Sequence, residues 1–313
     1  MAKNITVVGS TNIDKVVTVP RFANSGETLH TSNAQQEVMG GKGLNQAVAA
    51  ERSGASVTFI TKVGQEFDTT IITNSQEQGI SAAGILSSTT AETGQAYITV
   101  SGETGDNIIY IYGGANSELT AQDVTSKQEY IAQSDFVVAQ LEVPVKAVTT
   151  AFDIAKEQHH LTVLNPAPMP EDGFPTELLE RTDIIVPNQH ETFLLTGIEA
   201  KDAASLKANA EFYFQHGVKL VIITLGENGA FYMHSTGESG SVPAFKTNAV
   251  DTTAAGDTFI GSLVSELDTD MSNLEDAMTY AAAAAAITVS REGAQPSVPR
   301  RGEVETMIKE NHA

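Results

Sequence analysis

The sequence predicts an α/β fold, a three-layer α/β/α sandwich in which helices cover both faces of a mainly parallel sheet, with a small β-sheet lid. Short apolar runs alternate along the chain with longer stretches of helical periodicity, which is typical of a parallel sheet. Two separated stretches instead alternate apolar and polar residues and lack a long helix. We expect these two stretches to meet as a second, smaller sheet.

The apolar runs give the expected strands of the large sheet. They are ITVVG (5–9), VTFITKVG (57–64), DFVVAQLE (135–142), LTVLNP (161–166), DIIVPN (183–188) and VKLVIITLG (218–226). Several of them end in Gly, Asn, Glu or Pro, where polar loops begin. Since binding sites of such sheets lie at the carboxyl ends of the strands, we expect functional residues directly after these runs.

The alternating stretches cover residues 15–39 and 94–112, the second including GQAYITVSGETGDNIIYIY. A sheet built from both would form a lid over the strand ends of the large α/β domain, which then comprises residues 1–14, 40–93 and 113–313. The alternative is two surface hairpins without a function. No low-complexity linker and no internal repeat interrupts the chain.

Composition limits the class of protein. The chain has 313 residues, enough for one large domain with a small one attached. No apolar run reaches the length of a membrane span, and the N-terminus enters a strand without a basic region or cleavage site. The absence of cysteine excludes disulfides, thiolate nucleophiles and zinc–thiolate sites. We expect a cytoplasmic protein with no membrane partner.

The net charge disfavours a nucleic-acid partner. Eighteen Lys and Arg residues against 39 Asp and Glu residues give a formal charge of −21, and this field repels polyanions. A small anionic substrate would therefore need a confined positive site, made by a metal ion, a lysine or helix amides.

The stretch VDTTAAGDTFIGSL (250–263) predicts a loop followed by a helix. The helix is expected to begin near Gly256 or Asp257, because apolar residues then recur every three to four positions. These residues are Phe259, Leu263, Val264 and Leu267. Asp251 is followed by two β-branched threonines, which favour an extended or turning segment. The two aspartates therefore have different roles.

Asp257 has two interpretations. As an N-cap it would accept a hydrogen bond from an unpaired helix amide. Alternatively, the small side chains of Ala254, Ala255 and Gly256 leave the amides at the helix mouth open to an anion. An acidic residue beside such an anion site is suited to take a proton from the group that attacks the anion. This second interpretation indicates phosphoryl transfer.

The glycine loop MGGKGLNQAVAA (39–50) fits neither common nucleotide motif. Gly43 stands where a P-loop needs Ser or Thr, and the first strand is followed by VVGSTN, which lacks the glycines of the dinucleotide fingerprint. A dehydrogenase is therefore disfavoured. The loop still brings Lys42 and Asn45 to a helix start, where the backbone can approach a ligand. Lys42 is either a ligand contact or a solvated surface lysine.

Two further segments carry candidate residues. STNID (10–14) places Asn12 and Asp14 beyond the first strand, and an amide with a carboxylate can bind adjacent hydroxyls. The alternative is that Asn12 is an ordinary turn residue. AAAAAAITV (281–289) predicts a helix whose small residues pack closely against a neighbour or a flat ligand.

Taken together, the segments resemble the ribokinases of the phosphofructokinase-B-type carbohydrate kinase family over essentially the whole chain. The segments are STNID, GGKGLNQAVAAERSGA, QLE, LNPAP, VPNQHE, TLGENG, DTTAAGD and REGAQPSVP. GGKGLNQA and DTTAAGD are quite specific together, whereas TLGENG alone could be a hairpin turn. The resemblance implies a ribokinase-like fold of Rossmann type. It also implies transfer of the γ-phosphoryl group of ATP to the 5-hydroxyl of D-ribose, with Mg²⁺ on the nucleotide and K⁺ as activator.

The resemblance also implies roles for individual residues. Asp257 would be the general base, with the amides of Ala254, Ala255, Gly256 and Asp257 as the anion hole. Sugar hydroxyls would be held by Asn12, Asp14, Gly41, Lys42, Asn45 and Glu142, under an apolar lid face of Ala96, Ile98 and Ile111. ATP would lie along Asn188, Thr224, Leu225, Gly226, Glu227, Asn228, Gly229, Gly256 and Ala282, with Glu191 reaching Mg²⁺ through water. The potassium ligands would be Asp251, Thr253, Thr288, Arg291, Gly293 and Ser297.

Several points stay open after the resemblance. Ala282 stands where relatives often carry a polar residue, which leaves discrimination of the nucleotide base open. Glu292 is acidic where some relatives are basic, next to the cation loop. A homodimer joined through the lid sheets is implied, since exposed edge strands need covering. A related kinase for another sugar or a nucleoside, or a sensor that has lost turnover, are the rival functions.

Overall fold

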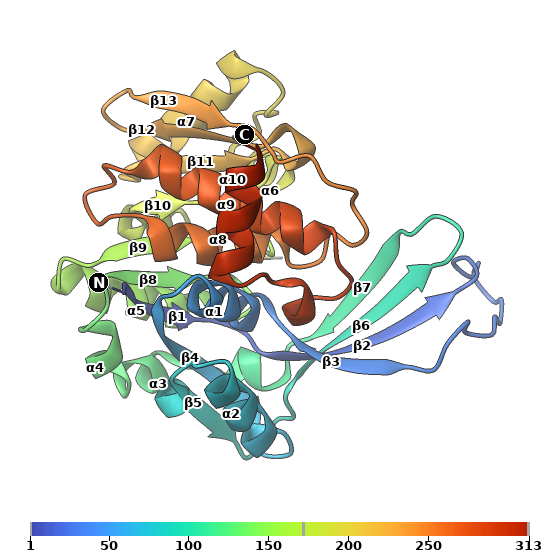
Figure 1. The fold of residues 1–313 in the computed structure, drawn as a ribbon. Coiled ribbons are helices and arrows are strands. Elements are labelled where there is room, and N and C mark those ends of the chain that lie inside the picture. Colours follow the sequence, from blue (N-terminus) through green and yellow to red (C-terminus); the bar gives the residue numbers. More distant parts are fainter. Residues whose placement is uncertain (1, 171–172, 312–313) are drawn as a thin grey trace.

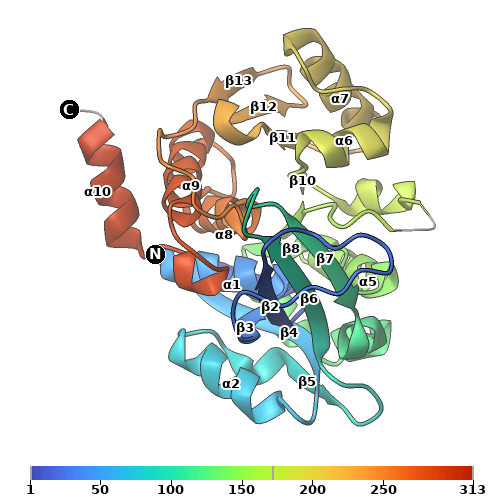
Figure 2. The same cartoon turned by 90° about the vertical axis from the view of Figure 1, so that its right-hand side faces the viewer.

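The computed structural model describes residues 2–170 and 173–311 and consists of a large sheet between helical layers and a smaller sheet that projects from it. The predicted three-layer α/β fold is confirmed. In Figure 1 the projecting sheet lies to the right of the large domain, and in Figure 2 it faces the viewer in front of the central strands.

The large sheet has nine strands in the order β13-β12-β11-β10-β9-β8-β1-β4-β5. Its interior strands are buried Val- and Ile-rich runs that pair in parallel, as expected for a sheet covered on both faces. The strands are β1 (Asn4–Val8), β4 (Ser56–Gly64), β5 (Ile85–Ser88), β8 (Phe136–Ala139), β9 (Leu161–Leu164), β10 (Ile184–Ile185), β11 (Leu220–Thr224), β12 (Ala230–His234) and β13 (Ser239–Val242).

Two hydrophobic clusters hold the helices on opposite faces of this sheet. One face carries α1 (Lys42–Arg52), α8 (Ala255–Glu266) and α9 (Leu274–Val289), with α10 (Arg301–Asn311) packed outside α9. The other carries α3 (Ala121–Thr125), α4 (Gln128–Ile131), α5 (Val145–Glu157) and α7 (Ala203–Gln215). The remaining helices are α2 (Asp68–Glu77), beside β5, and α6 (Gln189–Thr196), beside α7 and β11.

The small sheet has four strands in the order β3-β2-β6-β7. They are β2 (Asn12–Val19), β3 (Gln36–Gly40), β6 (Gly94–Ser101) and β7 (Asn107–Tyr112). The two predicted stretches therefore do meet in space, with β2 and β6 parallel over eight residue pairs. β2 and β3 run from Asn12 to Gly40, slightly beyond the predicted range of 15–39, whereas β6 and β7 lie within the predicted range of 94–112 and reach both of its ends. The division into domains at those boundaries, and closure as a lid, stay predictions.

Three strands of the large sheet, β5, β12 and β13, were not predicted from the sequence, and they lie at or next to the two edges of the sheet. β5 pairs in parallel with β4, whereas β12 and β13 form an antiparallel extension of β11. The segment TLGENG is the turn between β11 and β12, with a short 3₁₀ segment at Gly226–Asn228. The hairpin interpretation of TLGENG is thus correct as regards its structure, and it leaves the proposed nucleotide contact open.

Candidate functional site

Asp257 lies in the first turn of α8, at the carboxyl edge of the large sheet. The helix begins at Ala255, slightly earlier than predicted, and its N-cap is Ala254 in the left-handed conformation with φ 61°. The predicted apolar face of this helix is buried as expected. The N-cap interpretation of Asp257 is wrong, because its two carboxylate oxygens accept side-chain hydrogen bonds from α1. Asn45 Nδ2 donates to Oδ2 at 3.1 Å and Gln46 Nε2 donates to Oδ1 at 3.0 Å.

The glycine loop brings α1 against the end of β1. Gly41 is the N-cap of α1 and has φ 93°, a conformation that favours glycine. A Cβ at Gly40 would lie 2.0 Å from Asp14 Oδ2, so a side chain at this position would displace the carboxyl group of Asp14. Glu142 then accepts a hydrogen bond from the Lys42 backbone N–H at 3.0 Å. The predicted sugar residues from three separate segments are therefore neighbours.

Lys42 is the cation of this cluster and is partly buried rather than fully solvated. Burial alone would lower the pKa of its ammonium group, because the charged form loses water. Neighbouring negative charges outweigh that effect and raise the pKa above its ordinary value; they belong to Asp257, Glu142 and Glu191. Lys42 therefore stays charged and compensates the carboxylates around it.

Asn12 and Asp14 are the first and third residues of β2 and point toward this loop. The turn interpretation of Asn12 is wrong, since it pairs with Gly40 and Gly94 within the small sheet. Asn116 Nδ2 donates to Asn12 Oδ1 at 2.8 Å and fixes its orientation. Asp14 is only 7% exposed. Burial, followed by the charges of Glu142 and Asp257, raises the pKa of Asp14 to about 7.

The predicted lid residues share one face of the small sheet with Asp14. Asp14 pairs with Ala96 on β6, and Ala96 pairs with Ile111 on β7. Ile98 lies two residues further along β6 and therefore on the same face. Ala96 is buried, whereas Ile111 is 50% exposed. The face thus continues from the polar site to an apolar surface that remains accessible.

The predicted nucleotide residues follow β10 and β11. Asn188 pairs with Thr224 in an isolated parallel bridge, and the loop from Gly226 to Asn228 is exposed. Asn188 and Glu191 form the capping box of α6, in which Asn188 Nδ2 donates to Glu191 Oε1 at 2.9 Å. Burial is the main cause that raises the pKa of Glu191. Gly256 is exposed at the mouth of α8, while Ala282 is 7% exposed within the helical layer.

Asp251 joins the loop before α8 to the loop after α9. Its Oδ1 accepts from Thr253 N at 2.9 Å, and its Oδ2 accepts from Gly293 N at 2.9 Å. These hydrogen bonds lower the pKa of Asp251 although burial opposes them. Thr288 on α9 donates to Thr258 on α8 at 3.1 Å, which ties the same two helices together. Of the predicted cation residues, Asp251, Thr253 and Gly293 are thus joined by hydrogen bonds, while Ser297 donates to the Ala294 carbonyl and Arg291 pairs with Glu303.

The arrangement offers oxygen ligands but no dense carboxylate cage. Within residues 2–170 and 173–311, no group of three or more His, Cys, Asp or Glu side chains could hold a metal ion. A divalent ion would therefore depend on substrate phosphates and water besides Glu191, as Mg²⁺ commonly does. Among the same described residues, every helix falls short of the length and apolar character that a membrane span needs.

Sequence reasoning missed the side chains that support the site. Gln46 is buried against Asp257, Gln140 and Asn165 are buried against Gln46, and Asn116 donates to Asn12. Gln140 and Asn165 directly follow β8 and β9, in segments that contain other quoted residues. Polar residues immediately after buried strands were the signal that would have found them.

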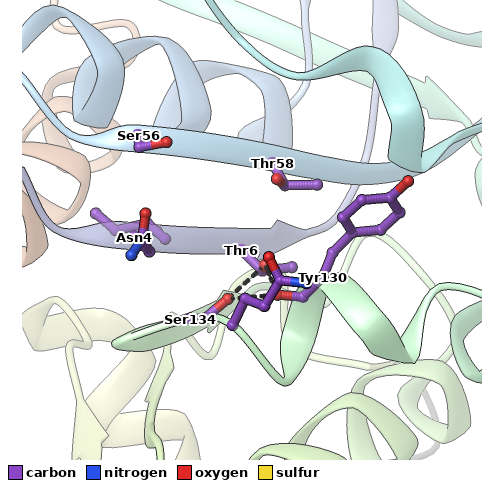
Figure 3. A pocket seen from close by; sticks show the side chains of 8 residues that line it. Asn4, Thr6, Ser56, Thr58, Tyr130 and Ser134 are labelled. Carbon is purple, nitrogen blue, oxygen red and sulfur yellow. Dashed lines mark hydrogen bonds between the residues drawn. The ribbon is translucent and has the colours of Figure 1, made fainter.

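A separate cavity lies at the amino ends of the central strands, opposite the end of the sheet where Asp257 lies (Figure 3). It has a volume of about 140 Å³ and is lined by Asn4, Ile5, Thr6, Ser56, Thr58, Tyr130, Gln133 and Ser134. These residues stand at the amino ends of β1 and β4 and on the adjoining α4 segment. The hydroxyls of Thr6 and Ser134 are 2.6 Å apart. None of the predicted site residues lines this cavity.

Comparisons with known proteins agree with the geometry. The family described as "pfkB family carbohydrate kinase" matches residues 2–301. The chain is 46% identical to the ribokinase of Staphylococcus aureus over 305 residues, covering 97% of this chain and 99% of that protein. It is 49% identical over 310 residues to the bifunctional ribokinase/ribose-5-phosphate isomerase A of Fructilactobacillus sanfranciscensis. That match covers 99% of this chain but spans only 57% of the bifunctional relative.

Solved structures give the same fold. The ribokinase of Arabidopsis thaliana complexed with ribose and ATP superposes with a TM-score of 0.89 at 28% identity, covering 99% of each chain.

Proposed function

This chain belongs to the pfkB family of carbohydrate kinases, and we propose that it is an ATP-dependent ribokinase. It transfers the γ-phosphoryl group of ATP to the 5-hydroxyl of D-ribose, giving D-ribose 5-phosphate and ADP. The observation that carries this assignment is the convergence of Asp257 with the sugar-loop residue Asn45 at the open mouth of α8.

In this reaction Asp257 acts as the general base. It takes the proton of the 5-hydroxyl, whose oxygen then attacks the γ-phosphorus as the bond to ADP breaks. The amides from Ala254 to Asp257 stabilise the charge of the transferring group, because phosphoryl transfer depends mainly on positioning and electrostatics. Two features support this role: α8 has no side-chain cap at its mouth, and Gly256 is exposed there.

The polar cluster around Lys42 is suited to a compact polyol. Its carboxylates accept hydrogen bonds, while Lys42 and Asn45 donate them. Asp14, with a pKa of about 7, can accept or donate according to its protonation. The hydroxyl-binding set consists of Asn12, Asp14, Gly41, Lys42, Asn45 and Glu142. Ala96, Ile98 and Ile111 cover the sugar when the small sheet closes and exclude water that would compete as acceptor.

ATP binds along the loops after β10 and β11, against Asn188, residues 224–229 and Gly256, with the base near Ala282. Mg²⁺ supplies charge compensation on the phosphates. Glu191 suits a water-mediated contact to this ion, since its carboxylate is already oriented by Asn188 and keeps free lone pairs.

A monovalent cation, K⁺, binds at the Asp251 junction. Asp251 supplies a carboxylate, Ser297 an oxygen, and carbonyls come from Thr253, Thr288, Arg291 and Gly293. Two observations support this site. Asp251 already links the two loops through hydrogen bonds, and all the atoms that would bind the cation are oxygens. A cation there stabilises the loop that presents the amides of the anion hole, and it activates without touching substrate.

The chain forms a homodimer through its small sheets. β7 is the edge strand of that sheet, and apolar side chains along it are exposed, from Ile108 at 38% to Tyr110 at 66%. An exposed apolar edge strand favours association.

A panel of pentoses, hexoses and nucleosides with ATP, scored for ADP release, tests the proposed activity. We expect D-ribose to give the highest kcat/KM. A hexose or nucleoside as the best acceptor would instead identify another kinase of the family. Sugar and nucleotide binding without any ADP release would identify a sensor.

A further inference from the structure

Gln46 contacts Asp257 although it belongs to neither the sugar set nor the nucleotide set. It follows Asn45 on α1 and is 0% exposed. Its Nε2 donates to Asp257 Oδ1 at 3.0 Å, whereas Asn45 Nδ2 donates to Oδ2 at 3.1 Å. Consecutive residues of one helix therefore hold the two oxygens of a single carboxylate.

The residues behind Gln46 fix which way its amide points. A carboxylate only accepts hydrogen bonds, so the NH₂ group of Gln46 faces Asp257 and its oxygen faces away. Gln140, which is 0% exposed, donates through Nε2 to that oxygen at 2.6 Å. If the Gln46 amide turned over, its oxygen would face the carboxylate and its NH₂ group would face that of Gln140. One orientation is therefore strongly preferred.

Asn165 supports the same orientation from another strand end. Its Oδ1 lies 3.3 Å from Gln46 Nε2, and its own Nδ2 donates to the Val186 carbonyl at 3.2 Å. Gln140, Asn165 and Val186 directly follow β8, β9 and β10. The carboxylate at the mouth of α8 is thus connected through Gln46 to the carboxyl ends of three central strands.

We propose that Gln46 is a positioning residue for phosphoryl transfer, which fixes the plane of the Asp257 carboxylate and leaves Oδ2 as the oxygen that receives the proton. This proposal rests on the proposed function. The 5-hydroxyl O–H bond breaks and its proton moves to Oδ2. The sugar oxygen forms the new bond to the γ-phosphorus, and the electron pair of the broken P–O bond leaves on ADP. Asn45 then shares Oδ2 with the sugar, while Gln46 keeps Oδ1.

Asp257 receives two side-chain hydrogen bonds, one on each carboxylate oxygen, that the neighbouring carboxyl group of Asp14 does not share. Asp257 faces a charged cluster made by Asp14, Glu142, Lys42 and Glu191. In the part of the chain that the structure describes, Asp14 has no side-chain hydrogen bond, and burial raises its pKa to about 7. The hydrogen-bond donors of this cluster are therefore directed at Asp257 and not at Asp14, so the carboxylate plane that they fix is that of Asp257.

The test compares Gln46→Met, the double variant Gln46→Met/Gln140→Met, and the control Asn209→Leu. Gln46→Met leaves the Gln140 donor unpaired, which costs about 1–3 kcal/mol of stability. The double variant removes that orphaned donor as well. Asn209 is a buried amide on α7 that donates to the Ser205 carbonyl at 2.8 Å, accepts a hydrogen bond from Thr196 at the far end of α6, and contacts none of the predicted site residues. It reports what losing a buried amide does to stability alone.

We expect Gln46→Met to lower kcat roughly 10- to 100-fold, because a small misplacement of a reacting group has an effect of this size. The KM values for ribose and ATP should stay within about threefold, since binding contacts are unchanged. The double variant should regain thermal stability but not kcat.

Three outcomes overturn the proposal. One is a folded Gln46→Met enzyme with kcat within about threefold of wild type. Another is recovery of kcat in the double variant in step with its melting temperature. The third is a loss of kcat in Asn209→Leu equal to that in Gln46→Met. If the wild-type chain releases no ADP with any sugar, the proposed kinase function is wrong as well. If the wild type is active and Asp257→Ala is inactive, the kinase function stands and only the role proposed for Gln46 is wrong.

Discussion

Asp14 holds its proton in the folded protein at a pH where the unfolded chain has lost it. Burial, then Glu142 and Asp257, raise its pKa from 3.8 to about 7. The difference between these two values corresponds to about 4 kcal/mol. Between them the folded state binds one proton more than the unfolded state, so the free energy of unfolding decreases as pH rises from about 4 to about 7 and is then constant.

Asp14→Asn removes this titration at nearly constant size. At about pH 4 the variant and the wild type should be similarly stable, and at about pH 7.5 the variant should be more stable by up to about 4 kcal/mol. The gain comes at the expense of sugar binding, as is common for strained polar sites. The amide introduced by the substitution would still donate a hydrogen bond, but it could not provide a carboxylate for the polyol.

Urea unfolding of both proteins at a series of pH values measures the effect. Asp106→Asn is the matched control, because Asp106 is exposed in the turn between β6 and β7. The control should leave the pH dependence of stability unchanged. A stability difference between Asp14→Asn and wild type that is independent of pH, or a variant that is less stable at pH 7.5, would refute the reasoning.

Three further predictions concern the proposed roles of single residues. Asp251→Ala should abolish the increase in rate between sodium and potassium buffers; an unchanged potassium response would remove the cation from the mechanism. Lys42→Met should lower kcat/KM for ribose about tenfold or more, because hydrogen bonds from a charged donor contribute about 1.5–3 kcal/mol, and an unaffected kcat/KM would contradict its role. Tyr110→Glu should shift the mass measured by light scattering from dimer to monomer, whereas a monomeric wild type, or a variant that stays dimeric, would argue against association through β7.

Much of the large domain could be predicted from the sequence because its strands are buried on both faces. A strand that is buried on both faces, such as ITVVG, is a continuous apolar run without alternating polar residues. The polar residues that follow such runs mark the carboxyl ends of the strands, where the site lies. Helix α8 was predicted from the spacing of its apolar residues, and its mouth was located within two positions. Sugar residues assigned by resemblance, such as Asp14, Asn45 and Glu142, are brought together around Lys42 and Asp257, although their contacts with ligands stay predictions.

The remaining features depend on long-range contacts that a local pattern does not encode. The strands β12 and β13 form an edge hairpin, whose short runs lack the continuous apolar character of the interior strands. The N-cap of α8, Ala254, has a left-handed conformation, which the sequence of small residues permits but does not require. The support of Asp257 by Gln46 joins residues that are 211 positions apart.

Asp257 is the residue on which the mechanism depends, and calorimetric binding combined with a coupled ADP assay on Asp257→Ala tests it most directly. We predict ribose and ATP affinities close to those of wild type, with turnover lower by roughly 10²–10⁴, the usual effect of losing a positioned base. An Asp257→Ala enzyme that binds both ligands and turns over at the wild-type rate would contradict the account.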